Sequence, residues 1–214
     1  MSLNSLQKEI NEHLRTHQTY RLGIMGGTFD PIHNGHMYCA YKSYDMLKLN
    51  KVLFIPAGVP VYKKDKQVTE ASLRIEMISA ALKDEPNFEV SLMEINRPGD
   101  TYTIDTLEEL KNTLPLGVEL FFIVGPDAFL TLPKWKDSAK IFELSTIVLV
   151  GFRESIPQDV LENIDLSRVC ILDIPKYNVS STMVRKAVKE NLDVKKLLPA
   201  PVLKIIKEQS LYKA

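Results

Sequence analysis

The sequence predicts an α/β fold, a doubly wound and mostly parallel sheet covered by helices on both faces. Apolar runs that suit strands alternate with segments of helical spacing along nearly the whole chain, an order typical of βαβ units. The apolar runs are continuous, as expected for strands whose two faces are both covered. Ligands of such sheets bind at the carboxyl ends of the strands, so the loops that follow the strands are the places to look for a site.

The first expected element is an amphipathic helix over residues 3–16. Its apolar residues recur at helical spacing, and they are Leu3, Leu6, Ile10 and Leu14. We interpret residues 1–19 as a helical extension outside the catalytic core and residues 20–214 as a single domain. His13 and His17 belong to that extension, where exposed helix surface is the simplest interpretation.

Six strands and five further helices are expected after the extension. The strands are predicted over residues 20–25, 51–56, 88–94, 118–125, 145–152 and 168–174. The helices are predicted over residues 35–48, from an N-cap at Thr69 to Leu82, from an N-cap at Thr103 onward, over 181–190 and over 201–208. The strongest strand signal is "VELFFIVG", which ends at Gly125 and is followed by Pro126.

Composition excludes several classes of function. Lys plus Arg and Asp plus Glu number 27 each among 214 residues, so broad electrostatic binding to nucleic acid is not expected. A local basic pocket for an anionic small molecule stays open. Cys39 and Cys170 have no CxxC partner, which argues against a disulfide scaffold or a zinc site and favours buried thiols.

The sequence shows no segment expected to enter a membrane. No apolar run reaches the roughly 18 residues of a membrane span, and the first twenty residues lack the apolar stretch of a signal peptide. We therefore expect a cytoplasmic protein. A homo-oligomer is compatible with the sequence, which leaves the oligomeric state open.

The stretch "GIMGGTFDPIHNGH" holds four of the nine glycines between a predicted strand and a predicted helix. This order presents backbone N–H groups and a helix N-terminus to an anion such as phosphate, although neither GxGxxG nor a P-loop is present. His33 and His36 stand three residues apart at the helix start, where both can donate N–H bonds and either can be protonated. Gly35 keeps a Cβ out of a gap suited to a nucleotide. The alternative is a capping histidine beside a surface histidine.

The stretch "GGTFDPIHNGH" resembles the signature of the HxGH nucleotidyltransferases, which are related to class I aminoacyl-tRNA synthetases. Within them it is similar to the bacterial nicotinate-mononucleotide adenylyltransferases, and the resemblance covers residues 20–212. It implies a Rossmann-like nucleotidyltransferase fold and the reaction of ATP with nicotinate mononucleotide in NAD biosynthesis. The implied ATP-binding residues of this loop are Gly26, Gly27, Thr28, Phe29 and His36, and the implied substrate-binding residue is Asp30. His33, His36 and Arg185 are the implied catalytic residues.

A second stretch, "VSSTMVR", follows the last predicted strand and opens a helix. Ser180, Ser181 and Thr182 offer hydroxyl and N–H groups there, and Arg185 lies one turn later on the face of Ser181. Such a convergence suits a triphosphate, although an ordinary serine N-cap with a surface arginine fits the spacing equally well. The stretch is similar to the SSTxxR motif of the family, which implies contacts to the phosphates of ATP.

Two stretches resemble the substrate-recognition segments of the same family. "RPGDTYTIDTL" is similar to RxGxSYTIDTL, which implies that Arg97, Tyr102 and Thr103 bind substrate. A helix N-terminus is a sound place for the pyridine carboxylate. The simpler interpretation is a capped helix that follows a turn.

The segment "GPDAFLTLPKW" is similar to GADxxxxLPxW, which implies ATP contacts at Gly125 and Asp127 and stacking of Trp135 on the nicotinate ring. Pro126 stands where the family has alanine and lacks one N–H donor. Unaided by the resemblance, a lone tryptophan is more often a core residue. The loop "GVPVYKKDK" aligns with PPHK, which implies a substrate contact at Lys63.

The implied chemistry needs Mg²⁺ but no metal site built by the protein alone, because no carboxylate cluster is visible and the ion can arrive with ATP. The expected partners are ATP and nicotinate mononucleotide. Two alternatives stay open. One is another adenylyl- or cytidylyltransferase of this fold, such as a pantetheine-phosphate adenylyltransferase, and the other is a non-catalytic nucleotide sensor.

Overall fold

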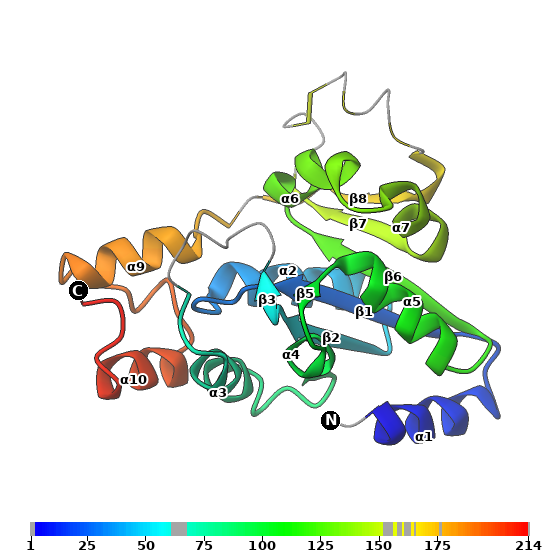
Figure 1. The fold of residues 1–214 in the computed structure, drawn as a ribbon, viewed down its shortest axis with the longest axis horizontal. Coiled ribbons are helices and arrows are strands. Elements are labelled where there is room, and N and C mark those ends of the chain that lie inside the picture. The colour runs from blue at the N-terminus through cyan, green and yellow to red at the C-terminus, as the bar shows by residue number, and fades with distance from the viewer. Residues whose placement is uncertain are drawn as a thin grey trace.

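A six-stranded sheet with all strands parallel forms the centre of the molecule (Figure 1). The computed structural model describes residues 3–60, 68–151, 156–157, 160, 164, 166–175 and 177–213. The strands are β1 (Tyr20–Gly27), β2 (Lys51–Pro56), β4 (Phe88–Val90), β6 (Val118–Val124), β7 (Thr146–Val150) and β8 (Val169–Leu172), in the order β4-β2-β1-β6-β7-β8. The chain builds outward from β1 in one direction and then from β6 in the other, so the predicted doubly wound sheet is confirmed.

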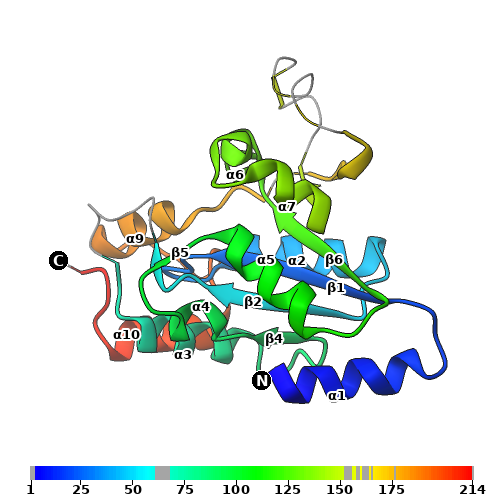
Figure 2. The same cartoon turned by 45° about the vertical axis from the view of Figure 1, so that its right-hand side comes forward.

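Helices cover both faces of this sheet (Figures 1 and 2). They are α1 (Leu3–Leu14), α2 (Asn34–Met46), α3 (Ala71–Ala81), α4 (Met93–Asn96), α5 (Thr103–Thr113), α6 (Pro126–Thr131), α7 (Ser138–Leu144), α9 (Ser181–Lys189) and α10 (Ala200–Glu208), with 3₁₀ turns at Leu132–Lys134 and Leu166–Arg168. The packing of strand β2 explains the apolar run at residues 52–56, because both of its faces are covered by helices. Val52 and Phe54 pack in the core beside α2 and α3, whereas Leu53 and Ile55 pack in the core beside α1 and α5.

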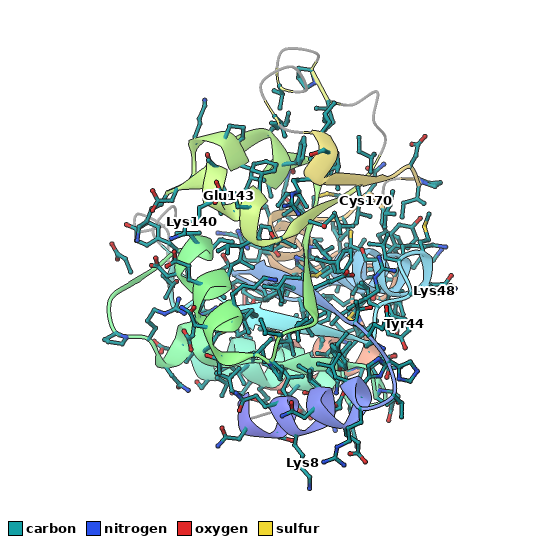
Figure 3. The ribbon with its side chains drawn as sticks, turned by 90° about the vertical axis from the view of Figure 1, so that its right-hand side faces the viewer. Lys8, Tyr44, Lys48, Lys140, Glu143 and Cys170 are labelled. Carbon is teal, nitrogen blue, oxygen red and sulfur yellow. The ribbon has the colours of Figure 1, made fainter. Side chains whose placement is uncertain are left out.

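Helix α1 is packed onto the core beneath α5. Leu6 and Ile10 are buried in the same cluster as the strand residues of β1. The helix is also tied by charge, since Lys51 Nζ lies 2.7 Å from Glu9 Oε2 and 2.7 Å from Glu89 Oε1. Figure 3 shows the opposite face of α1, where Lys8 points away from the body of the molecule.

Several predicted boundaries are wrong, and both misplaced helix starts have N-caps without a side-chain hydrogen bond. The N-cap of α3 is Glu70 rather than Thr69, and the N-cap of α5 is Tyr102 rather than Thr103. Strand β4 ends at Val90 rather than at residue 94, because the chain turns into the short helix α4.

Several elements of the fold were not predicted, among them the short helix α4, helices α6 and α7, and a small second sheet. Helix α6 begins at Pro126, which occupies its first turn. In the sequence, Pro126 indicates the end of the strand before it, but proline also suits the first turn of a helix. The small parallel sheet of β3 (Val59–Pro60) and β5 (Asp100–Thr101) is too short to produce an apolar pattern.

The two cysteines are half-buried free thiols rather than fully buried ones. Burial raises the pKa of the Cys39 thiol to about 11. Among the described residues, no helix is both long and apolar enough to cross a membrane.

Candidate active site

A cavity of about 470 Å³ lies at the carboxyl ends of the central strands. Gly26 and Gly27 from the end of β1, Gly125 after β6 and Val150 from the end of β7 all line it. Strands β1 and β6 are neighbours at the point where the direction of winding reverses. The cavity therefore occupies the position where doubly wound sheets bind ligands, and its size suits a small-molecule ligand.

Most of the predicted site residues meet in this cavity, although they come from three separate stretches of the sequence. Those that line it are Gly26, Gly27, Thr28, Phe29, Asp30, His33, His36, Gly125, Asp127, Trp135, Ser180, Ser181, Thr182 and Arg185. Arg97, Tyr102 and Thr103 do not line it. Lys63 lies outside the described residues.

His33 and His36 form a reciprocal cap at the start of α2. His33 is the N-cap, and its Nδ1 accepts a hydrogen bond from the N–H of His36 at 3.3 Å. In return, His36 Nδ1 accepts from the N–H of His33 at 3.2 Å. The two rings stack with centroids 3.7 Å apart, so the spacing predicted to place both imidazoles on one side does so.

This cap fixes the chemistry of both imidazoles. A nitrogen that accepts a hydrogen bond cannot carry a proton, so the proton of each neutral ring is assigned to Nε2. His33 is 6% exposed, and burial lowers its pKa to about 4. His33 is therefore a neutral N–H donor at pH 7. The sequence left open that either histidine could be protonated, and for His33 the burial disfavours this.

Gly35 brings the two phosphate-facing motifs together. A Cβ placed on Gly35 would lie 2.7 Å from Cγ1 of Val179 and 3.1 Å from Nδ1 of His33. Gly35 itself lines the cavity, as predicted, but the position of its missing Cβ is filled by protein rather than by ligand space. The missing Cβ allows the segment before α9 to pack directly on the N-terminus of α2.

The start of α9 is bonded to the loop that precedes α2. Ser180 is the N-cap and accepts from the N–H of Met183. The Ser181 hydroxyl donates to the Pro31 carbonyl at 3.0 Å, and Arg185 Nη1 donates to the Asp30 carbonyl at 2.7 Å. The guanidinium of Arg185 thus keeps a fixed place at the cavity wall while further N–H groups remain for a ligand.

The Asp30 carboxylate is held by partners on both oxygens. Its Oδ1 accepts from the Tyr212 hydroxyl at 2.6 Å, and its Oδ2 accepts from the Thr69 N–H at 3.2 Å. Below it, the buried Arg74 donates to the carbonyls of Thr28 and Ala57. Arg74 therefore stabilises the loops around the cavity, which is a structural role.

Arg97 has partners away from the cavity. Its Nη1 donates to the Thr106 hydroxyl at 2.9 Å and its Nη2 to Glu109 Oε2 at 2.5 Å. Thr106 in turn donates to the buried Glu94 at 2.8 Å. This network fastens α4 to the first two turns of α5.

Trp135 stands at the cavity wall next to the α5 segment. Its indole N–H donates to the Thr131 hydroxyl at 3.1 Å, and its ring meets Phe122 edge-on at 6.2 Å between centroids. The following residue, Lys136, lies 4.6 Å above the Tyr102 ring and 2.9 Å from Asp105. The segments that carry Trp135 and Tyr102 are therefore adjacent.

Sequence reasoning missed several residues of the cavity. Tyr38, Cys39, Val68, Pro175, Tyr177 and the pocket-facing side of Val179 all line it. Pro175 and Tyr177 follow β8, so the rule about strand ends could have found them. Tyr38 and Cys39 lie within α2 and carried no signal beyond helical spacing.

Comparisons with known proteins identify the class to which this chain belongs. Residues 24–187 match the family model described as cytidylyltransferase-like. Together the fold and the cavity define a nucleotidyltransferase.

Curated relatives identify the family within the nucleotidyltransferases. A probable nicotinate-nucleotide adenylyltransferase from Clostridium botulinum (strain Alaska E43 / Type E3) is 42% identical over 199 residues, which cover 90% of this chain and 98% of the relative. One of the same name from Dehalococcoides mccartyi (strain CBDB1) is 40% identical over 197 residues, with 90% and 97% covered. The chain belongs to the nicotinate-nucleotide adenylyltransferase family.

A solved structure confirms the fold. The Plasmodium falciparum nicotinic acid mononucleotide adenylyltransferase complexed with NaAD superposes with a TM-score of 0.75 at 20% identity, and the match covers 90% of this chain and 97% of that one.

Proposed function

We infer that this chain transfers the adenylyl group of ATP to nicotinate mononucleotide, giving nicotinate adenine dinucleotide and pyrophosphate. The carrying observation is that the His33–His36 pair and Arg185, which is far from that pair in the sequence, line one cavity at the switch point of the sheet. The family membership of the chain supports the same reaction.

The reaction joins two polyanions, so the protein's task is alignment and charge neutralisation. An oxygen of the mononucleotide phosphate attacks the α-phosphorus of ATP, and the bond from that phosphorus to the oxygen bridging to the β-phosphate breaks. A phosphate monoester has a second pKa of about 6, so it is already largely a dianion at neutral pH. The nucleophile therefore needs no general base.

The donors in the cavity suit that task. Each imidazole presents Nε2–H, Arg185 presents a fixed positive charge, and the N-termini of α2 and α9 add oriented backbone N–H groups. Donors fixed in advance stabilise the charge that develops on the phosphoryl oxygens without reorganising. Removing the distal N–H of either histidine is expected to lower turnover rather than to alter the fold.

We propose that Mg²⁺ enters with ATP. The described residues contain no cluster of three or more His, Cys, Asp or Glu side chains that could hold a metal. Of the two carboxylates that line the cavity, Asp30 is already bonded on both oxygens and Asp127 is exposed. The donor set fits an ion held mainly by phosphate oxygens and water, whose contribution is to neutralise phosphate charge.

The pyridine ring is proposed to lie at the Trp135 wall, with its carboxylate directed toward the N-terminus of α5. The adjacency of Lys136 to Tyr102 supports this path, since the first turn of α5 lies next to the tryptophan segment. Arg97 then acts on substrate only by holding α5 in place.

Pyrophosphate release measured with ATP and nicotinate mononucleotide tests the reaction. Parallel assays replace the acid with nicotinamide mononucleotide, replace it with 4′-phosphopantetheine, replace ATP with CTP, and chelate Mg²⁺ with EDTA. We expect release with the acid, at least tenfold less with the amide, and none after chelation. Release only with phosphopantetheine or CTP would favour another transferase of this fold, and ATP binding without release would favour a sensor.

A further inference from the structure

Tyr212 follows α10 and reaches back to the loop that precedes α2. Its hydroxyl donates to Asp30 Oδ1 at 2.6 Å, across 182 positions of sequence. The side chain is half-buried against the core cluster beside α2 and α3. No motif in the sequence marked this residue, and the resemblance assigned it no role.

The backbone at Tyr212 is held in an unfavourable conformation. Its φ is +63°, in the left-handed region that residues other than glycine rarely adopt and that costs about 1 kcal/mol or more. A residue keeps such a backbone conformation only where contacts with its surroundings compensate for the cost. In this conformation the Tyr212 hydroxyl bonds to the Asp30 carboxylate and also contacts the side chain of Thr69.

Asp30 is the residue through which Tyr212 reaches the site. Asp30 lines the cavity, yet it is only 5% exposed because its carboxylate is turned toward Tyr212 and Thr69. Its main-chain carbonyl accepts from Arg185. Asp30 thus places a negative carboxylate beside the expected phosphate position, while its main-chain carbonyl holds the positively charged Arg185.

We propose that Tyr212 is a positioning residue, whose hydroxyl keeps the Asp30 carboxylate out of the phosphate path while the Asp30 carbonyl holds Arg185. The proposal rests on the proposed function, because it takes the cavity to bind a triphosphate. Without the hydroxyl, the Asp30 carboxylate keeps a single N–H partner, and turning into the cavity to regain solvent brings it toward the bound phosphates. A buried carboxylate that loses a partner carries a large cost.

Burial, together with the bond to Asp30, raises the pKa of the Tyr212 hydroxyl above its ordinary value. The hydroxyl therefore stays protonated, and remains a donor, throughout the pH range in which the assays are run.

The test measures ATP binding by calorimetric titration, independently of turnover. Tyr212→Phe removes only the hydroxyl, and we expect the Kd for ATP to rise about tenfold, as for the loss of a hydrogen bond to a charged group. In an Asp30→Asn background, Tyr212→Phe is expected to raise the Kd for ATP less than threefold, because asparagine carries no negative charge that could turn toward the phosphates. The defect of Tyr212→Phe should also shrink as salt is added, since repulsion between exposed charges is screened.

Tyr20→Phe is the matched control for stability. Tyr20 also donates its hydroxyl to a carboxylate, that of Glu9 at 2.5 Å, but it stands at the start of β1, away from the cavity. We expect both phenylalanine variants to lower the unfolding temperature, and only Tyr212→Phe to weaken ATP binding.

Three results would overturn the role of Tyr212. They are an unchanged Kd in Tyr212→Phe, a loss of ATP affinity equal to that of Tyr20→Phe, and equal losses with and without Asp30→Asn. A wild-type chain that binds ATP but releases no pyrophosphate with any acceptor would instead overturn the proposed function, and the binding comparison would still decide the role of Tyr212.

Discussion

His33 and His36 are each other's helix cap, with Nδ1 of each ring accepting the main-chain N–H of the other. The bonds that cap α2 occupy Nδ1 of each ring. They therefore leave the proton on Nε2, the nitrogen that can donate to a ligand. Helix capping uses one edge of each imidazole, and the proposed phosphate recognition uses the opposite edge. Substitutions that imitate one edge at a time can separate these two roles.

Substitutions at His36 should separate its two nitrogens. Asparagine can imitate the Nδ1 acceptor and glutamine the Nε2 donor. We expect His36→Ala to lower kcat more than tenfold, His36→Asn to lower it similarly while keeping the cap, and His36→Gln to keep more activity than either. Steady-state kinetics with thermal unfolding of each variant checks this order. If alanine leaves kcat unchanged, His36 has no part in the mechanism.

The burial of His33 should appear in the pH dependence of stability. The unfolded chain has the ordinary histidine pKa of 6.5, and the folded chain has a value of about 4. Between these values the unfolded state binds the proton first, so the free energy of unfolding rises with pH. The contribution is present above pH 6.5 and is lost as the pH falls through 4, a change of roughly 3 kcal/mol.

Denaturant titrations at several pH values check that prediction, with His33→Asn as the comparison. Asparagine is a good N-cap and does not titrate, so this variant should lose less stability than wild type between pH 7 and 4. Parallel curves for the two proteins would show that His33 titrates normally in the fold.

Gly35→Ala should disturb the contact between the two phosphate-facing motifs. Its Cβ would meet Val179 Cγ1 at 2.7 Å, and overpacking of this kind costs about 1–3 kcal/mol. We expect lower stability and weaker ATP binding, and partial recovery of both in Gly35→Ala/Val179→Ala. Recovery is partial because the new Cβ also crowds the His33 ring. A double variant no better than the single one would place the conflict elsewhere.

Trp135→Ala should weaken binding of nicotinate mononucleotide more than binding of ATP. The indole stands at the cavity wall beside the α5 segment and is oriented by its bond to Thr131. Titration with each substrate separately measures the two affinities, and Trp135→Phe should keep part of the stacking. Equal losses for both substrates would show that Trp135 acts as a core residue.

The sequence by itself determined the fold class, the main strands and the loops that carry the site. Continuous apolar runs such as Lys51–Pro56 are local signals, and so is a glycine-rich loop between a strand and a helix. Those signals were sufficient because strands buried on two faces need side chains that are apolar in every position. They were not sufficient for helix ends, since the N-cap of α3 is Glu70, which makes no side-chain cap, rather than Thr69.

Only the tertiary structure decided what each polar group of the site bonds to. It showed that Arg97 fastens α5, that Gly35 makes room for Val179, and that Tyr212 holds Asp30. A hydrogen bond joins groups by distance in space and leaves no periodic trace along the chain. For that reason a residue 182 positions away can complete a loop whose own sequence gives no sign of it.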